Sequence, residues 1–215
     1  CLVGSEMCIR DRCKNGIFKS IQGEGYNCGK SAVFIRLAGC NMIPRCQFCD
    51  EKFDDSEELE EQEILERVIK FAPFAMVVIT GGEPTAQNLT DLVNLLKSNN
   101  FYVSIETNGM NKIDYNLDWI TCSPKNEKVN IKEVNELKFV VDKSCEEMNL
   151  FIDAVSSNVK HDYVYLQPES NKNSMISNCV EMISENSDYR LSLQIHKIIG
   201  CLLYTSPSPR DMRRS

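Results

Sequence analysis

The stretch GCNMIPRCQFCDE, residues 39–51, contains three cysteines, Cys40, Cys46 and Cys49, within ten positions. Thiolates at this spacing can ligate zinc or an iron–sulfur cluster, or they can form disulfides. A structural zinc site usually closes with four ligands, often arranged as two C-x-x-C pairs. This stretch has one such pair and one cysteine upstream, so a zinc site would need a further thiolate, for which the candidates are Cys28, Cys122, Cys145 and Cys179.

An iron–sulfur cluster fits three neighbouring thiolates better than zinc does. Three thiolates can hold three of the four irons of a [4Fe–4S] cluster and leave the fourth iron open to another ligand. Disulfide frameworks are typical of short secreted chains, and the sequence shows no convincing signal peptide. We therefore expect reduced cysteines, a cytoplasmic location and a cluster with one open iron.

Composition narrows the class of protein. The chain has 215 residues, 42% of them hydrophobic, which is enough for one domain with a sizeable core. Its formal net charge of −7 argues against direct binding to nucleic acid or to an anionic membrane, because both require basic surfaces. No apolar run approaches the roughly 20 residues that span a bilayer.

The two ends differ in composition from the rest. CLVGSEMCIRDR at the start and CLLYTSPSPRD near the end resemble translated sequencing-adapter sequence, and neither shows sustained periodicity. We therefore expect residues 1–12 and 201–215 to lie outside the fold, and residues 13–200 to form one catalytic domain.

Within that domain, apolar β-branched runs alternate with helical patterns. This alternation predicts a mainly parallel α/β sheet, either open or closed into a barrel. The expected helices span residues 57–72, 87–98, 144–156 and 173–186. The expected strands span residues 32–38, 76–80, 102–106, 119–122, 136–141, 163–166 and 191–195.

Polar clusters follow six of these strands. Because the carboxyl ends of parallel strands share one face of a barrel or sheet, we expect the clusters to converge there. In chain order they are Cys40, the GGEP of 81–84, the TNG of 107–109, the SPK of 123–125, the QPES of 167–170 and the HK of 196–197.

The cysteine stretch and GGEP together resemble the radical S-adenosylmethionine (SAM) superfamily. The usual superfamily spacing is C-x3-C-x2-C, whereas this sequence has C-x5-C-x2-C with Pro44 in the longer loop. The resemblance implies an α/β fold with a partial, compressed (β/α) barrel. It also implies a [4Fe–4S] cluster whose open iron binds the amino and carboxylate groups of SAM, which is cleaved to a 5′-deoxyadenosyl radical.

Further motifs are similar to the 7-carboxy-7-deazaguanine synthase family. They begin with FKSIQGEG and FIRLAGCN and continue through TGGEP, ETNG, SPK, LKFV, QP and RLSLQIHK. The resemblance implies that 6-carboxy-5,6,7,8-tetrahydropterin is contracted to 7-carboxy-7-deazaguanine with loss of ammonia, and that SAM is regenerated. It also implies magnesium, a homodimer, and an electron donor such as a flavodoxin or ferredoxin.

The residue types suit this substrate. Gln22, the Gly23 backbone and Glu24 offer paired donors and acceptors for the edge of a pterin. The Arg36 guanidinium, on a strand, matches the substrate carboxylate bidentately. The family pattern adds further substrate contacts, so that the expected set is Ile21, Gln22, Gly23, Glu24, Arg36, Thr80 and His196.

The same resemblance implies the residues around the cofactors. The expected cluster ligands are Cys40, Cys46 and Cys49. Glu51 stands where the family commonly has a magnesium-binding threonine, and its carboxylate oxygen is a suitable hard ligand. The residues expected around SAM are Phe48, Gly82, Glu83, Ser123, Pro124, Lys125, Gln167, Pro168, Glu169 and Ser170.

Two other functions compete with this interpretation. A radical SAM activating enzyme, which places a glycyl radical on a protein, would share the cysteine stretch. A non-enzymatic module that binds zinc or a cluster would share the cysteines alone. IQGEG together with Arg36 indicates a small carboxylated ligand, which argues against the activating enzyme, whereas the metal content of the purified protein would distinguish the module.

Overall fold

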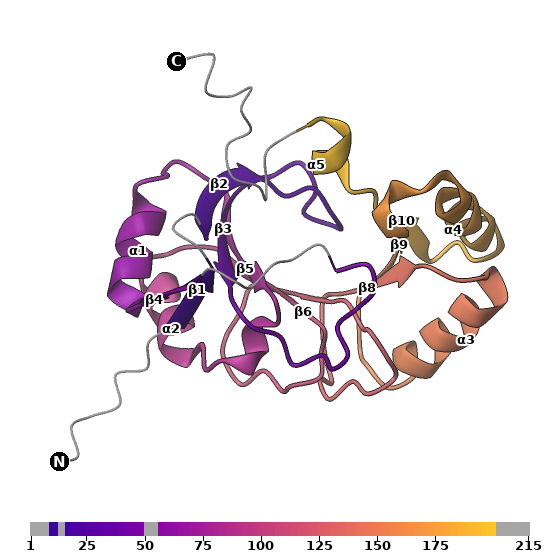
Figure 1. Cartoon of the computed structure of the whole chain (residues 1–215), viewed down its shortest axis with the longest axis horizontal. Coiled ribbons are helices and arrows are strands. Elements are labelled where there is room, and N and C mark those ends of the chain that lie inside the picture. Colours follow the sequence, from indigo (N-terminus) through magenta and orange to yellow (C-terminus); the bar gives the residue numbers. More distant parts are fainter. Residues whose placement is uncertain (1–8, 13–15, 50–55, 201–215) are drawn as a thin grey trace.

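The computed structural model describes residues 9–12, 16–49 and 56–200. Within these ranges the chain forms one sheet with helices packed on it (Figure 1). The α-helices are α1 (Glu61–Ile69), α2 (Thr90–Ser98), α3 (Cys145–Ser156), α4 (Asn173–Glu185) and α5 (Ile195–Ile198), and two 3₁₀ turns span Pro84–Ala86 and Glu169–Asn171. The strands are β1 (Ile9–Arg12), β2 (Ile17–Ile21), β3 (Ser31–Leu37), β4 (Ser56–Leu59), β5 (Met76–Gly81), β6 (Val103–Thr107), β7 (Trp119–Cys122), β8 (Glu136–Val141), β9 (Tyr163–Pro168) and β10 (Tyr189–Leu191).

The sheet is mainly parallel, as predicted. Its described strands follow the order β10-β9-β8-β7-β6-β5-β3-β1-β4, with β2 paired to β3. The run from β3 to β10 is parallel throughout, whereas β1, β2 and β4 pair antiparallel. The path does not close into a ring, which agrees with a partial barrel.

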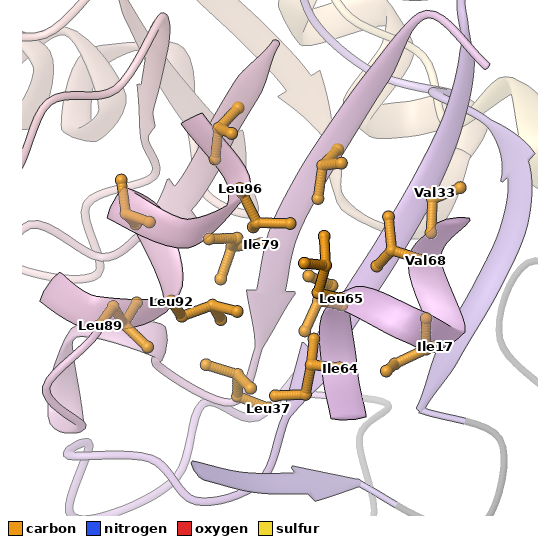
Figure 2. Packing of buried hydrophobic residues seen from close by; sticks show 14 of the residues in the cluster. Ile17, Val33, Leu37, Ile64, Leu65, Val68, Ile79, Leu89, Leu92 and Leu96 are labelled. Atoms are coloured by element: carbon orange, nitrogen blue, oxygen red, sulfur yellow. The ribbon is translucent and has the colours of Figure 1, made fainter. Parts of the chain in front are cut away.

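One face of the sheet carries the hydrophobic core. Apolar residues of α1 and α2, among them Ile64, Leu65 and Leu92, pack against β3, β5 and β6 (Figure 2). A second cluster joins α3 and α4 to β7, β8 and β9. Figure 1 shows the two helix pairs at opposite ends of the sheet. Their apolar stripes recur at helical spacing and are buried, which is the main source of helix stability in proteins.

The other face carries a small apolar cluster on β3 and β5, made by Ala32, Phe34, Met76 and Val78, and it is polar on β6 and β8. In β8, Leu137 and Phe139 belong to the core, whereas Glu136 and Lys138 alternate with them and therefore point the other way. In β6, Ile105 is a core residue and its neighbour Glu106 lines a pocket. The period of two thus gives β6 and β8 one apolar face for the helices and one polar face toward the pocket.

Two predicted elements and one predicted boundary are wrong in part. The helix expected over 57–72 begins only at Glu61, because residues 56–59 form β4 and pair with β1. That pairing also places Ile9–Arg12 in the sheet, although residues 1–12 were expected to lie outside the fold. Partners distant in sequence decide whether a short segment is a strand, and periodicity does not show them.

The strand expected over 191–195 is the second such element. β10 ends at Leu191, and the next residues form a loop that leads into α5. The backbone groups of this segment form hydrogen bonds with a side chain and with another loop instead of with a neighbouring strand. The backbone of Gln194 exchanges hydrogen bonds of 3.1 Å with the Asn171 side chain, and the Ile195 N–H donates to the Gly23 carbonyl at 3.1 Å.

The start of α3 provides a local stability test. The Ser144 hydroxyl accepts from the Glu147 N–H, and the Glu147 carboxylate accepts from Ser144 in return, which forms a capping box. We expect Ser144→Ala to lower the free energy of unfolding by about 1 kcal/mol. Chemical denaturation measures this loss, and Ser157→Ala at the other end of α3 serves as the control. Equal stability of both variants would contradict the assignment of the cap.

No helix in the described part of the chain is long and apolar enough to span a bilayer.

Candidate active site

A pocket opens where the parallel strands end. All six predicted polar clusters contribute to its wall, so the predicted convergence is confirmed. The predicted site residues that line it are Glu24, Arg36, Cys40, Cys46, Phe48, Cys49, Thr80, Gly82, Glu83, Ser123, Lys125, Gln167, Pro168, Glu169, Ser170 and His196.

The segment that leads from β3 into the first cysteine is bonded to the chain after β5 through backbone contacts. The N–H groups of Gly82 and Glu83 donate to the carbonyls of Leu37 and Gly39 at 3.0 and 2.8 Å. Gly81 has φ of +141°, and a Cβ at this position would lie 2.1 Å from the Leu37 carbonyl oxygen. Only glycine therefore permits the close approach that places GGEP beside the segment entering Cys40.

The three thiols share the pocket wall, although their sulfur atoms are not gathered around one point. In the described residues, no three His, Cys, Asp or Glu side chains are arranged to hold a metal ion. The donor set nevertheless fits an iron–sulfur cluster, because three soft thiols line one pocket and Cys40 and Cys49 are exposed.

The other cysteines considered as a fourth zinc ligand lie elsewhere. Cys122 and Cys179 are fully buried in the hydrophobic cluster of β7, β8, β9, α3 and α4, and Cys145 packs against that cluster. Burial raises the pKa of the Cys122 and Cys179 thiols to about 12, which disfavours thiolate ligation. Cys28, in the loop after β2, is absent from the pocket lining.

Around the cysteine loop, a lysine and an aromatic ring form one side of the pocket. Lys125 Nζ lies 5.5 Å from the centroid of the Phe48 ring, within the range of a cation–π interaction. Burial lowers the pKa of Lys125. Ser123, two residues earlier, is held by a 2.8 Å hydrogen bond from its hydroxyl to the Lys138 carbonyl.

The Glu83 carboxylate is occupied by protein donors. Its Oε1 accepts from the hydroxyls of Thr85 and Thr107 at 2.6 Å each, and its Oε2 accepts from the Asn108 N–H at 2.7 Å. The side chain is 99% buried. Glu83 therefore ties the end of β5 to the end of β6, and both of its carboxylate oxygens are already bonded to protein donors.

The opposite wall carries the residues predicted for the substrate. Arg36 of β3 and Thr80 of β5 are direct partners in the parallel register, so both side chains face the pocket from neighbouring strands. Arg36 is 6% exposed. His196 packs on the loop after β2, where a Cβ on Gly23 would lie 2.5 Å from His196 Nδ1. Gly23 therefore allows the close approach of the histidine.

Among the described residues, four that were predicted for the site do not line this pocket. Gln22 and Gly23 support it from behind, since the Gln22 amide contacts Glu24 and Glu106 and Gly23 packs on His196. Ile21 is 38% exposed at the end of β2. Pro124 lines a neighbouring cavity with Phe151, and Glu51 lies outside the described residues.

Sequence reasoning assigned no role to several polar residues of this site. Lys138 is buried on β8 and bonds to Glu24, and Glu106 of β6 lies beside it. Asn108 donates to the Asn41 side chain at 2.7 Å, which anchors the residue after the first cysteine. The sequence contained one signal for such residues, because two charged residues alternate with apolar ones at the start of the otherwise apolar strand ELKFVV.

Comparison with known proteins agrees with this geometry. The model of the radical SAM superfamily matches residues 34–159, which include the three cysteines and GGEP. The crystal structure of QueE from Escherichia coli superposes with a TM-score of 0.71 at 27% identity, covering 87% of this chain and 93% of that one. The fold and the site define a member of the radical SAM superfamily.

Closer relatives narrow the family. A 7-carboxy-7-deazaguanine synthase of Bacteroides thetaiotaomicron is 37% identical over 86% of this chain and 96% of its own length. The synthase of Haemophilus influenzae is 34% identical, over 86% of this chain and 91% of its own. The chain belongs to the 7-carboxy-7-deazaguanine synthase family.

Proposed function

We propose that this protein converts 6-carboxy-5,6,7,8-tetrahydropterin to 7-carboxy-7-deazaguanine with loss of ammonia, as a radical SAM carbon–nitrogen lyase. The observation that carries the proposal is the placement of Arg36, Glu24 and the three thiols around one pocket. The names of the relatives support the reaction. The superfamily implies a [4Fe–4S] cluster and SAM, which supply a carbon-centred radical able to abstract a hydrogen atom from the substrate.

The wall of β3 and the loop after β2 binds the substrate in this proposal. Arg36 pairs with the substrate carboxylate, and its planar fork is suited to bidentate contact. Glu24 accepts from the aminopyrimidine N–H groups at the other end of the ring. Thr80 and His196 complete the pocket beside Arg36. Because these groups come from different elements, binding the substrate orients it relative to the cysteine loop.

The opposite wall holds SAM. Lys125 meets its carboxylate or ribose, and Phe48, Gly82, Ser123 and the stretch 167–170 surround it, whereas Pro124 contributes only as the link between Ser123 and Lys125. Glu83 acts here through its backbone and by positioning Asn108, because its carboxylate is already bonded. Ser170 has φ of +51°, which turns the chain at the end of the 167–170 stretch.

The remaining features of the proposal concern metal and partners. Glu51 ligates Mg²⁺, the chain acts as a homodimer, and a flavodoxin or ferredoxin supplies the electron. The catalytic unit is contained in residues 13–200. A cytoplasmic location agrees with the free cysteines of the described residues.

Anaerobic reconstitution with iron and sulfide, followed by incubation with the pterin, SAM and a strong reductant, tests the reaction. We expect 7-carboxy-7-deazaguanine and ammonia in equal amounts, with SAM recovered. A reconstituted protein that cleaves SAM without forming this product would refute the assigned substrate. A protein that binds zinc and forms no iron–sulfur chromophore would refute the enzyme class.

A further inference from the structure

Lys138 is a buried cation on the pocket face of β8. Its side chain is 3% exposed, whereas the neighbouring carboxylates of Glu24 and Glu106 are 13% and 24% exposed. Lys138 Nζ lies 2.6 Å from Glu24 Oε2 and 3.7 Å from Glu106 Oε2. All three residues line the pocket, and the two glutamate side chains are more exposed in it than Lys138.

Two glutamines complete this arrangement into a ring. Gln22 Nε2 donates to Glu106 Oε1 at 2.9 Å, and Gln22 Oε1 accepts from the Glu24 N–H at 3.2 Å. Gln194 Nε2 donates to Glu24 Oε1 at 3.0 Å. Residues from the loop after β2, from β6, from β8 and from the segment before α5 thus fix both carboxylates in place. Each carboxylate keeps lone pairs free for further donors.

The charges of the ring depend on one another. Burial opposes the charge on Lys138, but the carboxylates of Glu106, Glu24 and Glu136 outweigh it and raise the pKa of Lys138. Burial likewise opposes the charge on Glu24, and the adjacent Lys138 outweighs it, so that the pKa of Glu24 is lowered. Like charges at this proximity, without a cation, favour protonation of one carboxyl group.

We propose that Lys138 is a positioning residue that keeps Glu24 ionised and holds it beside Glu106, so that the two side chains are paired acceptors for the N–H edge of the substrate's aminopyrimidine ring. This inference rests on the proposed function, because it assumes that the pterin occupies the pocket. A protonated carboxyl group would present a donor where the ligand also presents a donor, and one hydrogen bond would be lost.

Other titratable groups face this ring and bear on its pH response. His196 and Lys125 contribute attraction to Glu24, and the Cys28 thiol lies near the same carboxylate. On the sheet, Glu136 precedes Lys138 by two residues, and Tyr165 of β9 is its partner in register. Burial raises the pKa of Glu136, whose carboxylate bonds to the Tyr26 N–H and the Thr121 hydroxyl.

The test measures equilibrium binding of 6-carboxy-5,6,7,8-tetrahydropterin by anaerobic calorimetry. The protein carries cluster and SAM but receives no reductant, so turnover cannot occur. We compare the wild type, Lys138→Met and Lys138→Arg from about pH 5.5 to about pH 8.5, which spans the range above the ordinary glutamate pKa. Lys160→Met serves as the control, because Lys160 pairs with Glu133 on the surface at 2.7 Å.

We expect Lys138→Met to bind the pterin about tenfold more weakly than the wild type near pH 6, because one charged hydrogen bond is lost. Without the cation a carboxyl pKa rises, so affinity recovers as pH increases and the carboxyl group ionises. Lys138→Arg keeps the positive charge, so the ratio of its affinity for the pterin to that of the wild type should not change with pH. If the pterin itself gains or loses a proton in this range, the resulting change in affinity will be the same in the wild type and in the Lys160→Met control.

Three results would overturn the inference. The first is that Lys138→Met binds the pterin as tightly as the wild type does. The second is that Lys138→Met loses the same fraction of its affinity at every pH. The third is that the affinity of Lys138→Arg depends on pH in the same way as that of Lys138→Met. If Lys138→Met does not fold, Lys138→Met/Glu106→Gln replaces it, because that variant removes one negative charge together with the positive one. This double variant should bind the pterin weakly, with an affinity that does not change with pH. An affinity that changes with pH would count against the role of Lys138. A wild type that does not bind the pterin would instead refute the proposed function.

Discussion

Replacing Cys46 with alanine is expected to abolish turnover and cluster binding together. Cys46 is half-buried in the pocket wall, and its neighbours Cys40 and Cys49 are exposed. A [4Fe–4S] cluster held by three thiolates retains only two protein ligands after the substitution. We expect iron content and the visible absorption of the reconstituted protein to fall to background, and product formation to fall by at least about three orders of magnitude.

Cys145→Ala is the matched control for this prediction. Cys145 is also partly buried, but it packs at the start of α3 against the second hydrophobic cluster, away from the pocket. This variant should bind as much iron as the wild type. Retention of iron by Cys46→Ala, or its loss from Cys145→Ala, would mean that the cluster ligands have been misassigned.

Arg36→Ala is expected to lose turnover while SAM binding is retained. The guanidinium is buried on β3 beside Thr80, so the variant leaves the substrate carboxylate without its charged partner. Breaking a buried ion pair by removing one partner costs about 3–5 kcal/mol, which corresponds to a loss of about two to four orders of magnitude in kcat/KM. Arg36→Lys should recover part of this loss, because lysine restores the charge but not the bidentate fork.

Product formation and SAM binding are measured separately for these variants. Arg67→Ala is the control, since Arg67 of α1 pairs with Glu63 of the same helix and with Glu57 of β4, away from the pocket. It should show wild-type kinetics. Unchanged kcat/KM in Arg36→Ala would remove Arg36 from the substrate site. Loss of SAM binding in the same variant would indicate a general collapse of the pocket.

The parallel sheet could be predicted because its strands are marked locally. Apolar β-branched runs such as MVVIT and ELKFVV are separated by amphipathic helical patterns, and this alternation allows few topologies. The converging polar clusters followed from the same rule, and the pocket confirms them. The predictions for two short segments were wrong. β4 pairs with β1, and the loop at Gln194 is bonded to Asn171, and in both cases the partner is distant in sequence.

By itself, the amino-acid sequence determined the class of chemistry, since three close cysteines, GGEP and IQGEG each carry a recognisable chemical requirement. Only the tertiary structure decided which polar side chains meet. It directed the Glu83 carboxylate to Thr107 and Asn108, and it joined Glu24, Glu106 and Lys138 across as many as 114 positions. The physical reason is that a buried charge must find its partner in space, and local patterns do not encode that pairing.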